Sequence, residues 1–359
     1  MSSIHEQDVV TVRDIPRTRL AAIGWLVLAV VVAGTAAWEW GMREHGLVAG
    51  DLDDDKSSWS VERRRIAAGD HDGVAIVGGS RILFDTNLDV WEELTGRRPV
   101  QLALPGMSGQ RFLRDLAENS GFDGLVLVDV TPEQFFREGP GNPAFEGVLD
   151  YWPDEGPAKR AGHRIGQYLS RHLAFLENQY TLTALLDQVD VPNRGKIPGP
   201  YLRPWKLSET YEDRQTVLWR EIETNARLRE HAIRVWVGRD RPPTEDALIA
   251  RVCADVRESV ARIRARGGEV VFIRPPSAGA YYERERKNVP RTRGWDRLLR
   301  EADVFGIHFA DYPEMRDLEL PELSHLSREA ARDFTRAYVG VLVREEPWLV
   351  ARPARRPVS

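Results

Sequence analysis

One segment of the chain is too apolar and too long to remain exposed to water. Residues 20–38 read LAAIGWLVLAVVVAGTAAW and hold no charged side chain over 19 positions. A helix of about 20 apolar residues spans the hydrocarbon core of a bilayer. A cleaved signal peptide usually has an apolar region of about 7–15 residues and a small-residue cleavage site. The length favours an uncleaved transmembrane anchor, with a signal peptide as the alternative.

The charges that flank this segment predict its orientation. Three arginines precede it: Arg13, Arg17 and Arg19. The residues that follow it are mainly acidic. Because positive charge stays on the cytoplasmic side, residues 1–19 are expected to form a cytoplasmic tail and residues 20–40 the anchor. Residues 41–70 are expected to form a linker that ends in a first turn of helix, since SVERRRIAAG has a helical character. The remainder would be periplasmic or otherwise extracytoplasmic, in a single-pass protein of the inner (cytoplasmic) membrane.

Composition argues against several classes of protein. The net charge of −5 over 359 residues, without a basic patch, argues against nucleic-acid binding. The single cysteine, Cys253, excludes an internal disulfide and a cysteine-rich zinc site, and its apolar surroundings indicate a core position. No pair of histidines or acidic residues shows metal-ligand spacing. We therefore expect neither a metal ion nor another cofactor.

Short apolar runs alternate with amphipathic helical patterns after residue 70. The runs that resemble buried strands lie at 73–78, 99–104, 124–130, 269–275 and 306–311. Such alternation predicts an α/β domain over residues 71–359, with five strands in an open, mostly parallel sheet covered by helices on both faces. A long segment of about residues 138–243 interrupts the pattern, and its amphipathic character predicts a mainly helical insertion.

The turn after the first expected strand reads GGSR and ends with a candidate nucleophile. A phosphate loop would require a lysine near Arg81, and a dinucleotide turn would require a third glycine, so both are disfavoured. Ser80 is the alternative, either as a plain turn residue or as a nucleophile. A serine becomes nucleophilic only when a base accepts its proton and a further group orients that base.

Candidate partners for Ser80 follow the other strands, since reactive groups gather beyond the carboxyl ends of parallel strands. Glu322 and His325 follow the fifth strand, three residues apart, so that the carboxylate can orient the imidazole. Each could also be an ordinary loop residue. Arg274, at the end of the fourth strand, could meet an anionic group of a substrate or pair with a carboxylate.

Three short motifs then resemble a known family. VGGSR, LPGMSG and ELSHLS, in this order, are similar to the first, second and last sequence blocks of the SGNH (GDSL-like) hydrolase superfamily. The similarity is greatest to its membrane-anchored, alginate O-acetyltransferase-like branch. The resemblance implies a three-layer α/β/α fold with flavodoxin-like strand order. It also implies that Ser80 is the nucleophile, His325 the base and Glu322 its orienting acid, and that the Gly106 backbone contributes to an oxyanion hole.

Two positions depart from the family pattern. Gly79 stands where the first block usually has aspartate. The third block of the family supplies an asparagine to the oxyanion hole, but here the third strand ends with Asp129, whose negative charge would repel an oxyanion. Asn142 is a candidate donor from farther along the chain.

These features predict a serine esterase or O-acyltransferase that acts on an acyl ester. The resemblance implies an envelope carbohydrate as acceptor and a membrane protein as acyl donor. The alternative is a catalytically inactive SGNH-like domain that binds or assembles partners in envelope polysaccharide export. For the enzyme, we expect Ser80 Oγ within about 4 Å of a His325 ring nitrogen and Glu322 near the other nitrogen.

Overall fold

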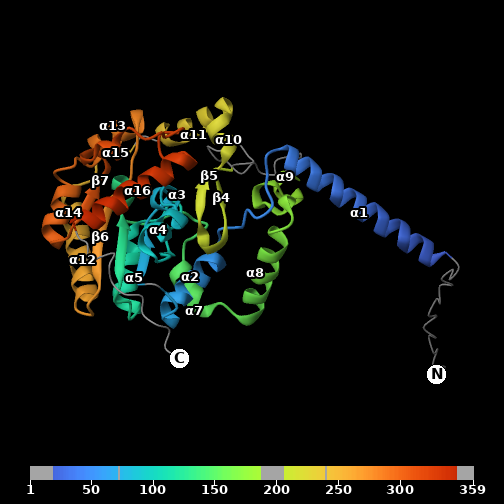
Figure 1. Cartoon of the computed structure of the whole chain (residues 1–359), viewed down its shortest axis with the longest axis horizontal. Coiled ribbons are helices and arrows are strands. Elements are labelled where there is room, and N and C mark those ends of the chain that lie inside the picture. The colour runs from blue at the N-terminus through green and yellow to red at the C-terminus, as the bar shows by residue number, and fades with distance from the viewer. Residues whose placement is uncertain (1–18, 72, 187–205, 239–240, 346–359) are drawn as a thin grey trace, which may run out of the picture.

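The computed structural model of the chain describes residues 19–71, 73–186, 206–238 and 241–345 (Figure 1). Its centre is a five-stranded sheet in the order β2-β1-β3-β6-β7, in which every neighbouring pair is parallel. The strands are β1 (Val74–Val77), β2 (Val100–Gln101), β3 (Leu125–Asp129), β6 (Glu269–Arg274) and β7 (Gly306–His308). The predicted α/β class and the five-stranded parallel sheet are confirmed.

Helices cover both faces of this sheet, and side chains alternate between the two. Ala75 and Val77 of β1 pack into one apolar cluster, whereas Val74 and Ile76 pack into the other. The first cluster includes side chains of α2 (Lys56–Ala68), α5 (Gly109–Asn119), α12 (Asp246–Arg264) and α14 (Trp295–Ala302). The second includes side chains of α3 (Ser80–Asp85), α4 (Leu88–Thr95), α15 (Pro313–Arg316) and α16 (Arg328–Glu345). Burial on both sides explains why the strands appear as continuous apolar runs.

Smaller elements complete the described chain. Helices α6 (Pro132–Phe135) and α13 (Gly279–Asn288) follow β3 and β6. The long segment between β3 and β6 contains α7 (Val148–Asp154), α8 (Pro157–Ser170), α9 (Leu182–Leu186), α10 (Arg220–Thr224) and α11 (Ala226–Val237). It also contains an antiparallel hairpin of β4 (Ser208–Thr210) and β5 (Thr216–Leu218), which the sequence pattern did not indicate. Short 3-10 turns lie at Ala174–Leu176, Asn178–Tyr180, Glu212–Arg214 and Phe309–Asp311.

Most of the predicted linker is instead part of the folded domain. Helix α2 lies within residues 41–70 and packs against the sheet, where Trp59 is fully buried and its Nε1–H donates to Leu102 O over 2.9 Å. Arg63 is buried on the same helix and pairs with Asp115 of α5 at 2.7 Å. The pattern looked like a linker because the inward face of α2 includes a charged residue, whose partner is distant in sequence.

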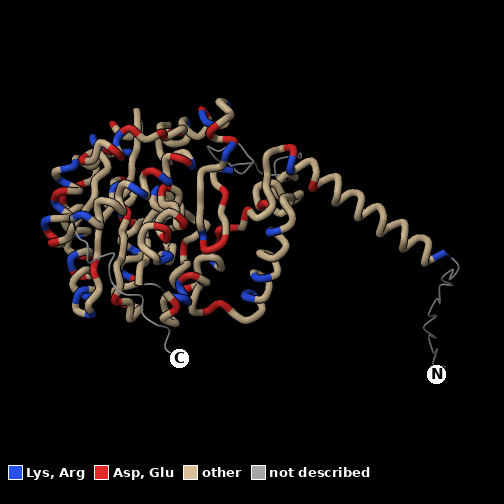
Figure 2. Tube along the Cα trace, viewed as in Figure 1, with Lys and Arg blue, Asp and Glu red and all other residues tan. Residues whose placement is uncertain are grey.

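Helix α1 (Leu20–Glu44) protrudes from the rest of the molecule (Figure 1). It has 25 residues, none of them buried, and is long and apolar enough to cross a membrane. Its charges lie only near its two ends (Figure 2). Of the predicted cytoplasmic tail, only Arg19 lies within the described residues.

Candidate active site

Ser80 begins α3 directly after a tight Gly-Gly turn at the end of β1. A Cβ atom on Gly78 would lie 2.4 Å from the Cβ of Asp129, and one on Gly79 would lie 2.8 Å from Oε1 of Gln134. The contact with Asp129 Cβ makes glycine necessary at position 78. A side chain at position 79, such as the aspartate of the family pattern, would require the end of Gln134 to move.

The structure brings together the three side chains that the sequence singled out. Ser80 Oγ lies 2.9 Å from His325 Nε2, within the expected 4 Å. His325 Nδ1 lies 2.7 Å from Glu322 Oε1. His325 and Glu322 are almost completely buried, whereas Ser80 is partly exposed. The serine is therefore the member of the group that a ligand can reach.

The contacts of Glu322 select one tautomer of the histidine. Glu322 Oε1 accepts hydrogen bonds from the backbone N–H of His325, at 2.6 Å, and from its Nδ1–H. The other oxygen, Oε2, accepts a hydrogen bond from Nε1–H of Trp236. With Nδ1 protonated, Nε2 has a free lone pair and accepts the hydroxyl proton of Ser80. Sequence reasoning missed Trp236, which lies in α11 of the insertion.

The loop that holds Glu322 and His325 contains a strained residue and is held in place by contacts with α3. Leu323, between them, has φ of 73°, a left-handed conformation that is unusual for a bulky residue. The backbone N–H of Leu326 donates to the buried carboxylate of Asp85 over 2.9 Å. Strained residues of this kind persist where surrounding contacts hold them, often at functional sites. These contacts let a loop after β7 reach back to a serine after β1.

Ser80 opens into a cavity of about 520 Å³. Gly106 and Asn142 also line this cavity, as do Gln134, Arg137, Asp53, Trp236, Tyr281 and Arg241. Gly106 has φ of 73°, and a Cβ atom there would lie 3.0 Å from the Cβ of Asn142. The amide of Asn142 donates to Pro105 O and accepts from Ala144 N, each over 3.1 Å. Asn142 therefore holds the loop around Gly106 in place.

The buried carboxylate of Asp129 holds the Gly-Gly-Ser turn in place from the interior of the protein. One of its carboxylate oxygens accepts a hydrogen bond from the Gly79 backbone N–H over 3.0 Å, and Thr131 Oγ1–H donates to the same carboxylate. Burial raises the pKa of Asp129, and the Gly79 hydrogen bond and the charge of Arg81 oppose this rise. Asp129 does not line the cavity next to Ser80.

A different side chain from the region after β3 does reach the cavity. Gln134 of α6 lines it, and its Oε1 atom is buried without a hydrogen-bond partner in the described chain. The same atom lies against Gly79, immediately before Ser80. The sequence signal was a polar residue close behind β3, but α6 was needed to orient it. Gln134 is therefore a side chain from the region after β3 that borders the same cavity as Ser80.

Arg274 is a core residue, not a ligand-binding one. Its side chain is 2% exposed and pairs with Glu285 at 2.7 Å, and it also donates to Ser277 Oγ. Arg81 pairs with the same Glu285 at 2.9 Å. Of the two alternatives left open by the sequence, the structure supports the carboxylate pairing. An isolated charge at this depth would be strongly destabilising, so the shared glutamate keeps both arginines buried.

Other arginines approach the cavity instead. Arg284 lines it but pairs with Glu133 at 2.9 Å. Arg137 and Arg241 have no acidic partner among the described residues. Burial and the nearby charge of Arg241 both lower the pKa of Arg137. Two like charges without a carboxylate suit an anionic group on a ligand.

Acidic residues also line this cavity. Lys206 is buried between Asp51 and Glu177, which it contacts directly. Asp53 also lines the cavity, and its carboxylate makes no hydrogen bond within the described chain. Burial and the negative charge of Glu177 raise the pKa of Asp53 to about 7. The cavity therefore holds groups of both charges.

Within the described residues, no cluster of three or more His, Cys, Asp or Glu side chains is arranged to hold a metal ion. Comparison with known proteins found no family model that matches the chain and no curated protein that matches its sequence.

Proposed function

We propose that this protein is a membrane-anchored, extracytoplasmic serine esterase or O-acyltransferase of the SGNH type. The observation that supports it most is the continuous contact from Ser80 Oγ through His325 to Glu322, at 2.9 Å and 2.7 Å. The strand order and the helices on both faces of the sheet support a three-layer, flavodoxin-like arrangement.

In this proposal, Ser80 Oγ attacks the carbonyl carbon of an acyl ester while His325 Nε2 takes its proton. The tetrahedral intermediate collapses, the ester C–O bond breaks, and His325 returns the proton to the departing alcohol. The acyl group is then bound to Ser80. Water or a carbohydrate hydroxyl attacks it, again giving its proton to His325, and Ser80 is released. Glu322 stabilises the charged imidazolium both when the acyl-enzyme forms and when it is broken down.

The oxyanion would be held by backbone and amide donors. The backbone N–H groups of Ser80 and Gly106 donate no hydrogen bond within the described chain, so both are free to bind a ligand. Gln134 would supply the third donor, in place of the asparagine that the family places after the third strand. Such donors are effective because they are positioned before the charge develops.

The anchor and the cavity suggest the partners. Helix α1 would insert in the inner membrane, with residues 1–19 cytoplasmic and the domain periplasmic, close to a membrane protein that donates the acyl group. Trp236 lines the cavity and would stack on a sugar ring of an envelope carbohydrate. Arg137 and Arg241 suit an acceptor that bears negative charge.

One observation favours a second function. The position after β3 that should supply asparagine holds Asp129, which is directed toward Gly79 instead of the cavity. If Gln134 does not replace the missing donor, the domain would bind or assemble envelope polysaccharide partners without catalysis.

Labelling with a fluorophosphonate probe tests the choice, because the probe reacts only with an activated serine. Purified full-length protein should be labelled at Ser80, and Ser80→Ala should abolish the label. Ser208→Ala is the matched control, since Ser208 lines the same cavity but has no contact with His325. Absence of labelling in the folded wild-type protein would favour the binding function.

A further inference from the structure

Helix α8 has its charged face toward the protein and its apolar face toward the outside. This is the reverse of an ordinary surface helix, whose apolar stripe packs on the core. The two faces of α8 can be assigned separately, from the residues that line a cavity and from those that are exposed.

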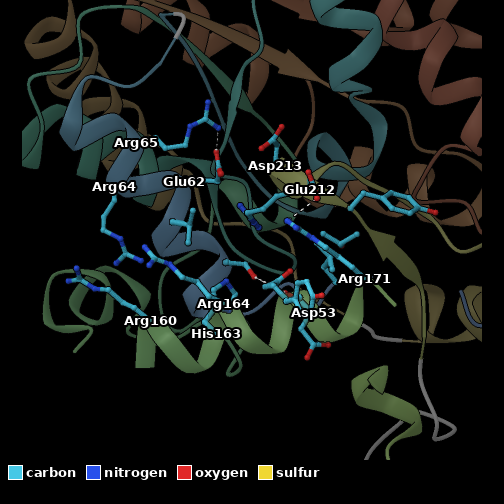
Figure 3. A pocket seen from close by; sticks show the side chains of 18 of the residues that line it. Asp53, Glu62, Arg64, Arg65, Arg160, His163, Arg164, Arg171, Glu212 and Asp213 are labelled. Carbon is cyan, nitrogen blue, oxygen red and sulfur yellow. Dashed lines mark hydrogen bonds and ion pairs between the residues drawn. The ribbon is translucent and has the colours of Figure 1, made fainter. Parts of the chain in front are cut away.

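The charged face of α8 borders a cavity of about 740 Å³ (Figure 3). Arg160, His163, Arg164 and Gln167 come from α8, and α2 and the β4–β5 hairpin form the other walls. Gln167 Nε2 donates to Asp53 O over 3.4 Å and to Ser58 Oγ over 3.3 Å, and the His163 ring lies 3.8 Å from Asp55. Polar contacts with the domain therefore orient this face of α8 inward.

The opposite face of α8 is apolar and exposed. Ala158, Ala161, Ile165 and Leu169 recur at helical spacing along it. Ile165 is 61% exposed and Leu169 is 41% exposed. No described segment of the chain covers these side chains. Exposed apolar side chains that continue along one helix face indicate a surface that contacts something other than water.

The contacts of α8 place it at the end of the anchor. Ser170 O, at the last residue of α8, accepts a hydrogen bond from Gly50 N over 2.8 Å. The carboxylate of Glu39 in α1 accepts hydrogen bonds from the backbone N–H groups of Ala174 and Phe175, just beyond α8. Figure 1 shows α8 running crosswise to α1, beside the end of α1 nearest the domain.

We propose that α8 lies flat in the outer-leaflet interface of the membrane that α1 spans, with Ile165 and Leu169 among the acyl chains. This inference rests on the proposed insertion of α1. Lipid is the occupant that the structure favours, because α8 ends beside the domain-proximal end of α1, where that apolar helix would leave the bilayer (Figure 1). Trp40, 68% exposed, is a residue type enriched at this depth.

A second attachment of this kind would fix the orientation of the domain on the membrane. Leu52 and Asp53 line both the cavity beside α8 and the cavity beside Ser80. The lipid contact of α8 would therefore hold the entrance to Ser80 at a constant distance from the bilayer. An acyl donor within the membrane could then reach the serine without movement of the whole domain.

Fluorescence quenching by lipids tests the proposal. Single cysteines are introduced as Ile165→Cys, Val30→Cys in α1 and Glu258→Cys on the exposed face of α12. Each full-length protein is labelled with an environment-sensitive thiol dye and placed in nanodiscs of phosphatidylethanolamine and phosphatidylglycerol, with or without nitroxide-labelled acyl chains. Cys253 is buried, and burial raises its thiol pKa to about 11, so the native thiol should not react.

The three positions separate the possible outcomes. We expect nitroxide lipids to reduce the fluorescence at Val30 and Ile165 but not at Glu258. Quenching at Val30 without quenching at Ile165 would overturn the proposal for α8 and leave the anchor intact. Loss of quenching at both would overturn the anchor itself. If the Ile165 label is exposed to aqueous iodide in nanodiscs but shielded in native membranes, a protein partner occupies the face and the lipid proposal is wrong.

Discussion

The loop that holds His325 and the outer face of α8 both depart from the usual sorting of side chains by polarity. In the loop, an imidazole and a carboxylate are almost fully buried. On α8, Ile165 and Leu169 are exposed on the outer face, while Arg160 and Arg164 border the cavity on the other face. The buried polar pair is stable because both nitrogens of His325 and both oxygens of Glu322 have partners. The exposed apolar stripe has no compensating contact within the described chain.

The comparison shows that a polar group is buried where nearby groups satisfy its hydrogen bonds. The exposure of an apolar helix face instead reflects what lies outside the protein. A polar group can be buried wherever the fold supplies hydrogen bonds. A continuous apolar helix face that stays exposed indicates a surface that meets a partner or a lipid phase. The following experiments test each side of this contrast.

The largest effect is expected on the free energy of unfolding, in an experiment that compares α8 with the ordinary amphipathic helix α12. Val256 of α12 is buried in the core, so Val256→Asp should lower the free energy of unfolding by about 4 kcal/mol. Ile165→Asp should change it by less than about 0.5 kcal/mol, because the side chain is already exposed. Thermal unfolding of the detergent-solubilised proteins measures both. Equal losses would mean that the outer face of α8 is packed against protein.

Gln134 is an exception among the polar groups near Ser80, because its Oε1 atom has no partner. If the amide binds the oxyanion, Gln134→Ala should lower kcat for p-nitrophenyl acetate by about 10²-fold, with little change in KM. Gln134→Glu should be similarly impaired, since it preserves the shape but removes the donor. Gln179→Ala, at another glutamine of the same cavity, is the control. An unchanged kcat in both Gln134 variants would exclude this donor.

Asp53 lies between the two regions and should make stability depend on pH. Its folded pKa of about 7 is above the ordinary value of 3.8, so the folded state holds the proton more tightly than the unfolded state. Ionisation therefore destabilises the fold progressively from about pH 4 to pH 7, and fully above pH 7. Asp53→Asn should be more stable than wild type by roughly 1–3 kcal/mol at pH 8 and equal to it near pH 4. A stability difference that is the same at all pH values would contradict this.

The smallest effect is expected at Trp236, which positions Glu322 from the insertion. Trp236→Phe keeps an aromatic ring near His325 but removes the indole donor to the Glu322 carboxylate. We expect kcat to fall by about 3–10-fold, which corresponds to roughly 1 kcal/mol, without a change in KM or thermal stability. Trp219→Phe is the matched control, because that indole donates to Gly46 O, remote from the serine. A loss of thermal stability equal to the loss in rate would indicate a structural role alone.

Much of the architecture was predictable because its signals are local. The strands of the sheet are buried on both faces and appear as uninterrupted apolar runs. The stripe of α12 follows helical spacing over 19 residues. The helical character of α2 was visible in SVERRRIAAG, but its packing against the sheet was not, because Arg63 is inward and its partner Asp115 lies 52 positions away. The β4–β5 hairpin has strands of only three residues each, too short for a periodic signal.

The candidate site shows the same division. Ser80, Glu322 and His325 could be identified because each follows a recognisable strand and occurs in a motif with specific spacing. Gln134 and Trp236 have no such motif, and only the packing of α6 and α11 brings them to the serine. Arg274 was ambiguous in the sequence, and its pairing with Glu285 of α13 decided between the two alternatives.

The sequence by itself determined the apolar segment of α1, the alternation of strands and helices, and the residues of the Gly-Gly-Ser turn, because each depends on neighbours a few positions apart. Only the tertiary structure decided which face of α8 is outward, which carboxylate each buried arginine meets, and which side chains complete the surroundings of Ser80. These depend on contacts between segments up to 245 residues apart. The spacing of apolar residues shows that a helix has two different faces. Which face is covered by the rest of the protein depends on the free energy of the whole folded chain.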